Sequence, residues 1–172
     1  MRSVCERHWP PADPYADVDV PEIGTVNIPA IGLNDHKVVE GITLTAINEG
    51  PGHWPGSALP GQRGNAVFPG HRTTYSHPFY DIDALVPGDE MTFTMADGTH
   101  TYAVTESFIV SPEDLWVVDQ TENSTATIIA CHPRGSARQR IVVKFELVSS
   151  VASEGAGRAA GVLAGLSEQL PI

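Results

Sequence analysis

Residues 90–110 read EMTFTMADGTHTYAVTESFIV, which is two alternating runs joined by a turn. Polar and apolar side chains alternate along residues 90–96 and again along residues 100–110, and this is the period of a half-buried β-strand. Asp97 and Gly98 lie between the runs, and this dipeptide is favoured in tight hairpin turns. The pattern predicts an antiparallel hairpin.

Similar strand signals occur on both sides of the hairpin, at residues 23–31 (interrupted by Pro29, as an edge strand tolerates), 38–42, 65–70, 125–130 and 139–148. Short helical segments are expected at residues 43–49, at 76–85 and from 111 onward. The chain has 16 Gly, 14 Pro and only 18% charged residues, which favours a turn-rich β protein over a helical bundle. We therefore predict an all-β fold with short helices, a small barrel or a sandwich.

The length and composition of the chain limit its organisation. The 172 residues suffice for one domain with a core, and we expect an extended lead-in over residues 1–20, a folded domain over 21–148 and a flexible or weakly helical tail over 149–172. The net charge of −11, without a basic stripe, argues against nucleic acid as a partner. We find no run of about 18 apolar residues that would span a membrane, and no signal-peptide pattern at the N-terminus.

Three residues of chemical interest stand at the ends of strand-like segments. His71 follows residues 65–70, Cys131 follows residues 125–130, and Arg140 comes nine residues after Cys131. Acyl transfer through a thioester needs a thiol to attack, an imidazole to move a proton, and a fixed cation or donor for the oxyanion. From these residues alone, an inert buried cysteine beside two surface residues remains the alternative.

The other candidate ligands do not form a metal site. Cys5 lies in the polar lead-in, and His53, His77 and His100 have no zinc-site spacing with a second cysteine. His132 and Cys131 are adjacent on a strand, so their side chains point to opposite faces. We predict no metal ion and no cofactor.

Six sequence blocks carry a resemblance to a known family. They are Gly50-Pro-Gly-His-Trp-Pro55, Ala58-Leu-Pro-Gly61, Gly64-Asn65 leading into Gly70-His-Arg-Thr-Thr74, Leu85-Val-Pro-Gly-Asp89, Thr127-x-x-x-Cys-His-Pro133 and Ser136-Ala-Arg-Gln-Arg140. These six blocks occur in this order between residues 23 and 148. Through them the chain resembles the sortases, and among the sortases the class E type of high-GC Gram-positive bacteria. The resemblance implies the closed eight-stranded sortase β-barrel.

The resemblance also implies a reaction. Cys131 would attack the Thr carbonyl of an LPxTG-like sorting signal, LAxTG in class E, and expel Gly; His71 would be the general acid and base, and Arg140 would hold the substrate or the oxyanion. Arg138 competes with Arg140, because alternation puts both on one face, but the spacing of Arg140 from Cys131 matches the family. Substrate contacts are expected from Tyr75, Thr73, Trp116, Ala130, His132 and Arg138.

Two of these substrate contacts have structural alternatives. The hydroxyl of Tyr75 could select the second residue of the signal, or Tyr75 could be a packed loop aromatic. Trp116 lies in the segment that covers the substrate in sortases, or it is a buried anchor of that segment.

As partners, the resemblance implies secreted proteins that carry a sorting signal and an amine acceptor on a peptidoglycan precursor or a pilin, with the enzyme a monomer. It places the protein at the extracytoplasmic face of the membrane or in the cell wall of a Gram-positive bacterium, without an anchor in this chain. The alternatives are a cysteine hydrolase and a non-catalytic barrel that binds the signal. A papain-like enzyme has Cys before His, the reverse of this order, and the Ser-His-Gly-Cys block of L,D-transpeptidases is absent.

Overall fold

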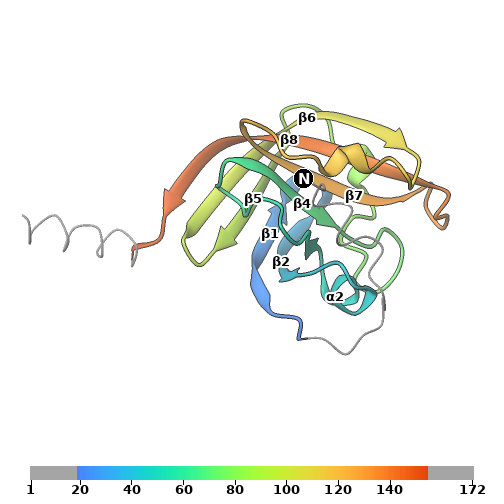
Figure 1. The fold of residues 1–172 in the computed structure, drawn as a ribbon, viewed down its shortest axis with the longest axis horizontal. Coiled ribbons are helices and arrows are strands. Elements are labelled where there is room, and N and C mark those ends of the chain that lie inside the picture. The colour runs from blue at the N-terminus through green and yellow to red at the C-terminus, as the bar shows by residue number, and fades with distance from the viewer. Residues whose placement is uncertain (1–18, 155–172) are drawn as a thin grey trace, which may run out of the picture.

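The computed structural model describes residues 19–154, and within them the chain forms eight strands around one core (Figure 1). The strands form one sheet in the order β3-β2-β1-β5-β6-β8-β7-β4. Their bounds are β1 Glu22–Ile28, β2 Leu33–Glu40, β3 Gly52–His53, β4 Gly64–Pro69, β5 Glu90–Met95, β6 Gly98–Val110, β7 Ser124–His132 and β8 Gln139–Ala152. The helical elements are α2 Leu44–Glu49 and the 3₁₀ helices η1 Pro29–Ile31, η2 Ile82–Ala84 and η3 Leu115–Val118.

The sheet curls into a nearly closed barrel. Its first and last strands, β3 and β4, meet where the backbone N–H of Trp54 donates to the carbonyl of Val67 at 2.8 Å. The predicted eight-stranded β-barrel with short helices is thus confirmed, although a loop contact rather than a full ladder closes it.

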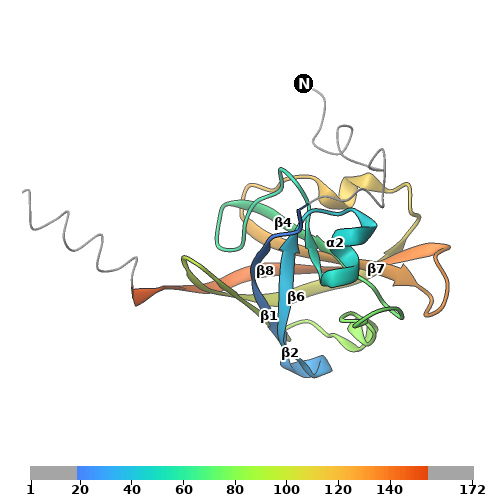
Figure 2. The same cartoon turned by 90° about the horizontal axis from the view of Figure 1, so that it is seen from below.

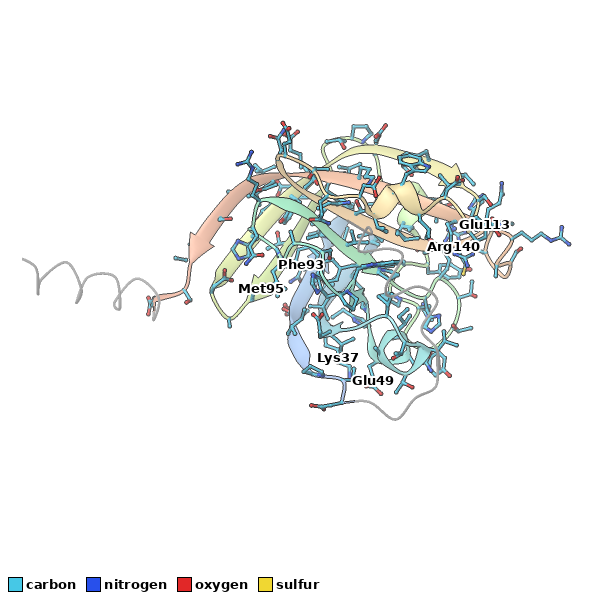
Figure 3. All side chains as sticks on the ribbon, in the orientation of Figure 1. Lys37, Glu49, Phe93, Met95, Glu113 and Arg140 are labelled. Carbon is cyan, nitrogen blue, oxygen red and sulfur yellow. The ribbon has the colours of Figure 1, made fainter. Side chains whose placement is uncertain are left out.

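The barrel interior holds the main core. Phe68 on β4 stacks on Phe93 on β5 with ring centroids 4.7 Å apart, and Tyr102 on β6 meets Phe93 edge-on at 6.0 Å. All three side chains are fully buried, and Figure 3 labels Phe93 on β5. Burial of such large aromatic rings contributes strongly to barrel stability.

A second apolar cluster, here called the outer cluster, covers the outer face of β4, β7 and β8. It comprises Ile42, Ile47, Trp54, Val67, Val117, Val118, Ile129 and Val142. On β7, Ile128 and Ala130 point into the barrel core while Ile129 belongs to the outer cluster, as the period of two requires. The outer cluster is roofed by α2 and η3, and Figure 2 shows α2 against the outside of the sheet.

The predicted local elements are partly confirmed. The helix expected at residues 43–49 is α2, and the Thr43 side chain caps it by accepting from the N–H of Ala46 at 3.1 Å. The helix expected at residues 76–85 is wrong, because only η2 is helical there. Tyr75 and His77 both have positive φ, which is incompatible with an α-helix and turns the chain before it can form.

The hairpin of residues 90–110 is confirmed with a different turn. Its loop residues are Ala96 and Asp97, and Gly98 already pairs with Met95. Gly98 has φ +146°, and a Cβ there would lie 2.1 Å from the carbonyl oxygen of Val151, so glycine is required by the close approach of β8.

Strand β8 continues four residues beyond the predicted end at Val148. It does so because β6 offers a partner along its whole length, with Gly98 opposite Ala152. In Figures 1 and 2 this end of β8 and the β5–β6 hairpin project beyond the rest of the barrel.

Most of the expected lead-in (residues 1–20) and tail (residues 149–172) lies outside the described residues. Over residues 19–154, no helix has both the length and the apolar character needed to cross a bilayer.

Candidate active site

Cys131 lies near the end of β7 on the face that carries the outer cluster. Its Cα partner across the antiparallel β7–β8 ladder is Arg140. Directly paired residues point to the same face, so the thiol and the guanidinium begin side by side. Cys131 is a half-buried cysteine without a disulfide, and it lies at the end of a strand between β8 and β4.

His71 is brought to the same end of the sheet by β4. This strand runs parallel to β7 with Pro69 opposite Ile129, and the N–H of Gly70 donates to the carbonyl of Ile129 at 3.0 Å. A Cβ on Gly70 would lie 2.5 Å from the ring of Phe79, so the close packing before His71 needs glycine. Main-chain pairing therefore sets His71, Cys131 and Arg140 on three adjacent strands or strand ends.

All three residues line one cavity of about 150 Å³. Its walls are mostly apolar, and they come from α2, the end of β4, the end of β6 and the segment that contains η3. The other lining residues are Leu44, Ile47, Trp54, Pro69, Gly70, Val110, Ser111, Pro112, Asp114, Leu115, Val117, Val118, Ile129 and Ala130. An apolar cavity with a thiol, an imidazole and a guanidinium at one side is suited to an extended peptide whose carbonyl reaches the thiol.

The imidazole of His71 is held on both sides. Its Nε2 lies 2.7 Å from Oδ1 of Asn48 on α2, and its ring stacks on Tyr75 with centroids 5.2 Å apart. With the amide oxygen as acceptor, Nε2 carries the hydrogen and Nδ1 has the free lone pair. Asn48 was not predicted; its place at the end of a capped helix gives no sequence signal for contact with a residue 23 positions away.

Arg140 and Arg138 differ clearly in position. The guanidinium of Arg140 donates through Nη1 to the carbonyls of Ala137 at 2.9 Å and Gln139 at 3.0 Å, and it borders the cavity. Arg138 is exposed and lies in the loop before β8, so strand alternation does not extend to it, and it does not line the cavity. Figure 3 shows Arg140 beside Glu113, whose carboxylate interacts electrostatically with the guanidinium.

Comparison with known proteins identifies the family. A family model described as the sortase domain matches residues 26–148. The chain belongs to the sortase family. It is 28% identical over 124 residues to sortase D of Bacillus subtilis and 25% identical over 149 residues to sortase SrtE1 of Streptomyces coelicolor. These alignments cover 70% and 80% of this chain, but the chain spans only 61% and 41% of those relatives.

Solved structures agree with this assignment. A sortase E from Streptomyces avermitilis superposes with a TM-score of 0.70 at 30% identity, covering 78% of this sortase and 92% of that chain. A Clostridium perfringens sortase D5 transpeptidase gives 0.69 at 32% identity, covering 77% and 83%. The fold of this sortase is thus shared with both class D and class E relatives.

The expected substrate contacts of this sortase are distributed unevenly. Ala130 lines the cavity but points into the barrel core, and Trp116 is 55% exposed and stacks on Phe108 outside the cavity, so it is not a buried anchor. Tyr75 is 66% exposed and covers His71. Thr73 is exposed on the loop beyond His71, and His132 contacts Arg72 away from the cavity; neither residue lines the cavity.

In residues 19–154, no three His, Cys, Asp or Glu side chains gather into a metal site.

A polar network supports the wall of the sortase cavity. Nζ of Lys144 on β8 donates to the carbonyl of Val117 at 2.6 Å and to Oγ1 of Thr127 at 2.8 Å, and that hydroxyl donates to Oδ1 of Asn65 at 2.7 Å. Nδ2 of Asn65 donates to the carbonyl of Asp119 at 3.0 Å. The network ties η3, which lines the cavity, to β4, β7 and β8.

Burial lowers the pKa of Lys144 to about 8, against the partial opposition of Glu106 and Asp119. The unfolded chain then binds more protons than the folded one between pH 8 and 10.5, so stability must rise with pH across this window. Because Lys144 keeps some solvent contact, we expect a gain of about 1 kcal/mol between about pH 7.5 and about pH 9.5. Urea denaturation at both pH values measures it. The matched Lys144→Met variant should lack this increment, and an equal pH dependence in both proteins would contradict the assignment.

Burial lowers the pKa of His71 below its ordinary 6.5. The imidazole is therefore neutral at neutral pH and available as a base, and it becomes protonated only at lower pH. We expect the acid limb of kcat/KM for peptide cleavage to have its midpoint below pH 6.5. A pH–rate profile measures it, with His71→Gln as the variant that should lose both the limb and about 10²–10⁴-fold in rate. A midpoint above that value would show that burial does not control this imidazole.

Proposed function

We propose that this sortase is a cysteine transpeptidase that cleaves an LAxTG- or LPxTG-type sorting signal between Thr and Gly. The observation that carries the proposal is the convergence of Cys131, His71 and Arg140 on one apolar cavity. The match to class E and class D relatives supports a sorting-signal substrate, and the resemblance of the sequence blocks to class E favours the LAxTG form. The curated relatives are longer than the part matched here, so activity and partners are proposed for this chain.

The first half of the reaction forms a thioester. The thiol of Cys131 gives its proton to the neutral imidazole of His71, and the sulfur forms a bond to the Thr carbonyl carbon of the signal. The carbonyl oxygen becomes an oxyanion, which the guanidinium of Arg140 stabilises after it leaves the loop carbonyls that it now contacts. The Thr–Gly C–N bond then breaks as the imidazolium returns its proton to the leaving Gly amine.

The second half resolves the thioester. An amine of a peptidoglycan precursor or a pilin attacks the Thr carbonyl carbon, His71 takes the amine proton, and the C–S bond breaks. The proton on His71 then returns to the sulfur, which restores the thiol and leaves a new amide. These partners place the proposed activity at the extracytoplasmic surface of a Gram-positive cell, with the enzyme acting as a monomer.

The test is the intact mass of the protein after incubation with an LAxTG peptide, and separately with an LPxTG peptide. A matched Cys131→Ala protein serves as the control, and each reaction is repeated with an added amine. An adduct that lacks the Gly segment, requires Cys131 and passes to the amine supports the transpeptidase and ranks the two signals.

The other outcomes identify the alternatives. Release of the acyl group to water despite saturating amine indicates a cysteine hydrolase. Peptide binding without an adduct or product indicates a non-catalytic barrel that binds the signal. Either result would overturn the proposed transpeptidation.

A further inference from the structure

A second arginine lies directly behind the candidate nucleophile. Arg72 follows His71 in the chain, yet it is only 3% exposed, whereas Arg140 at the cavity is half-buried. A buried guanidinium is unfavourable unless its donors and its charge are matched by partners. The partners of Arg72 therefore indicate why the fold retains it.

Those partners come from both sides of the site. Nη1 of Arg72 donates to the carbonyl of Cys131 at 3.1 Å and to Nδ1 of His132 at 3.2 Å. Nε donates to the carbonyl of Tyr80 at 3.0 Å, and Nη2 pairs with Asp83 at 3.1 Å. One side chain thus joins the loop that begins at His71 to the peptide of the nucleophile.

We propose that Arg72 is a positioning residue of this site, which fixes the peptide of Cys131 relative to His71. The proposal rests on the proposed function for its effect on turnover, but the contact with Cys131 also bears on thiol reactivity without substrate. A sulfur lies within a few ångströms of its own carbonyl oxygen, so the guanidinium adds a fixed positive charge behind the thiolate. The other charged or titratable groups at this point are His71, Arg140 and Asp114 at the cavity, Glu113 near Arg140, and His132 and Asp83 beside Arg72.

A neighbouring arginine provides a matched comparison. Arg134 donates to the same Tyr80 carbonyl at 3.0 Å and pairs with Asp81 at 2.8 Å and Asp83 at 2.9 Å. Its side chain is 40% exposed, and its hydrogen bonds and ion pairs go to Tyr80, Asp81 and Asp83. It shares Asp83 and the Tyr80 carbonyl with Arg72, but it is exposed and has no link to Cys131 or His132.

The experiment compares Arg72→Lys and Arg72→Gln with Arg134→Gln and wild type. We expect kcat for the sorting peptide to fall about 10–100-fold in the Arg72 variants with KM changed less than about 2-fold, since misplacing reacting groups affects the chemical step. Alkylation of Cys131 by iodoacetamide should slow, and its pH profile should move upward. Arg72→Lys, which keeps the charge, should be less impaired than Arg72→Gln. Arg134→Gln should match wild type.

A variant in the barrel core distinguishes the effect of lower stability from the effect of a displaced Cys131 peptide. Phe93→Leu weakens the barrel core away from Cys131, so it shows what destabilisation alone does at a matched Tm. If the Arg72 variants lose no more kcat than Phe93→Leu and keep the wild-type alkylation profile, the proposal is overturned. If wild type cleaves no peptide, the proposed function fails, and the alkylation profiles alone decide: slower alkylation in the Arg72 variants supports the positioning role, and equal rates reject it.

Discussion

Replacing Cys131 with alanine should abolish acyl-enzyme formation and lower peptide cleavage by at least about 10⁴-fold, because Cys131 is the only thiol within residues 19–154. The fold should persist. Cys131 is half-buried at a strand end and keeps its ladder with Arg140 after the change, so the loss of one sulfur atom should destabilise by about 1 kcal/mol or less. Intact mass and a peptide-cleavage assay measure activity, and thermal unfolding measures stability.

The control for this result is Cys131→Ser, which keeps the shape but offers a much weaker nucleophile. It should form no adduct on the time scale of wild type. Residual cleavage near the wild-type rate in Cys131→Ala would mean that another residue carries the chemistry, and this would reject the assignment of the nucleophile.

Replacing Arg140 with alanine should lower kcat by about 10²–10³-fold, the size expected for loss of one oxyanion donor. The reason is its position directly opposite Cys131 across the ladder, at the border of the cavity. Single-turnover acylation measured by rapid quench isolates this step from thioester resolution. Wild-type KM with reduced kcat would place the contribution in the transition state.

Arg138→Ala is the matched variant, since the two arginines are two residues apart and only Arg140 borders the cavity. Its loss should be well below that of Arg140→Ala. An equal loss in both variants would overturn the choice of Arg140. Arg140→Lys should recover only part of the activity, because an ammonium cannot reproduce the planar fork of a guanidinium.

Much of this fold follows from local sequence signals. The alternation in residues 90–110 and the short helical pattern of residues 43–49 each predict an element from a few neighbouring residues, and both elements form. The helix expected at residues 76–85 does not form, because positive φ values at Tyr75 and His77 turn the chain. Positive φ is uncommon for residues other than glycine, so the sequence did not predict it at these two positions.

The candidate site likewise contains residues that the sequence predicts and residues that it does not. His71, Cys131 and Arg140 could be proposed from residue type and position at strand ends, and the structure brings them to one cavity. Asn48, Arg72 and Lys144 could not, because each acts through a partner brought close only by the folded sheet. The sequence spacing of these contacts, 23, 59 and 27 residues, carries no periodic signal.

The placement of β7 between a parallel and an antiparallel neighbour has a consequence for the diversification of such proteins. The strand ladders set Cys131 opposite Arg140 and bring the end of β4, just before His71, beside them, so loops other than the one that carries His71 and Arg72 are free to vary in length and sequence without misaligning the three groups. The segment ahead of η3, which lines the cavity, can therefore be exchanged to recognise a different peptide while the bond-making geometry is inherited unchanged. An engineer seeking a new signal preference would leave the strands intact and randomise residues 111–114.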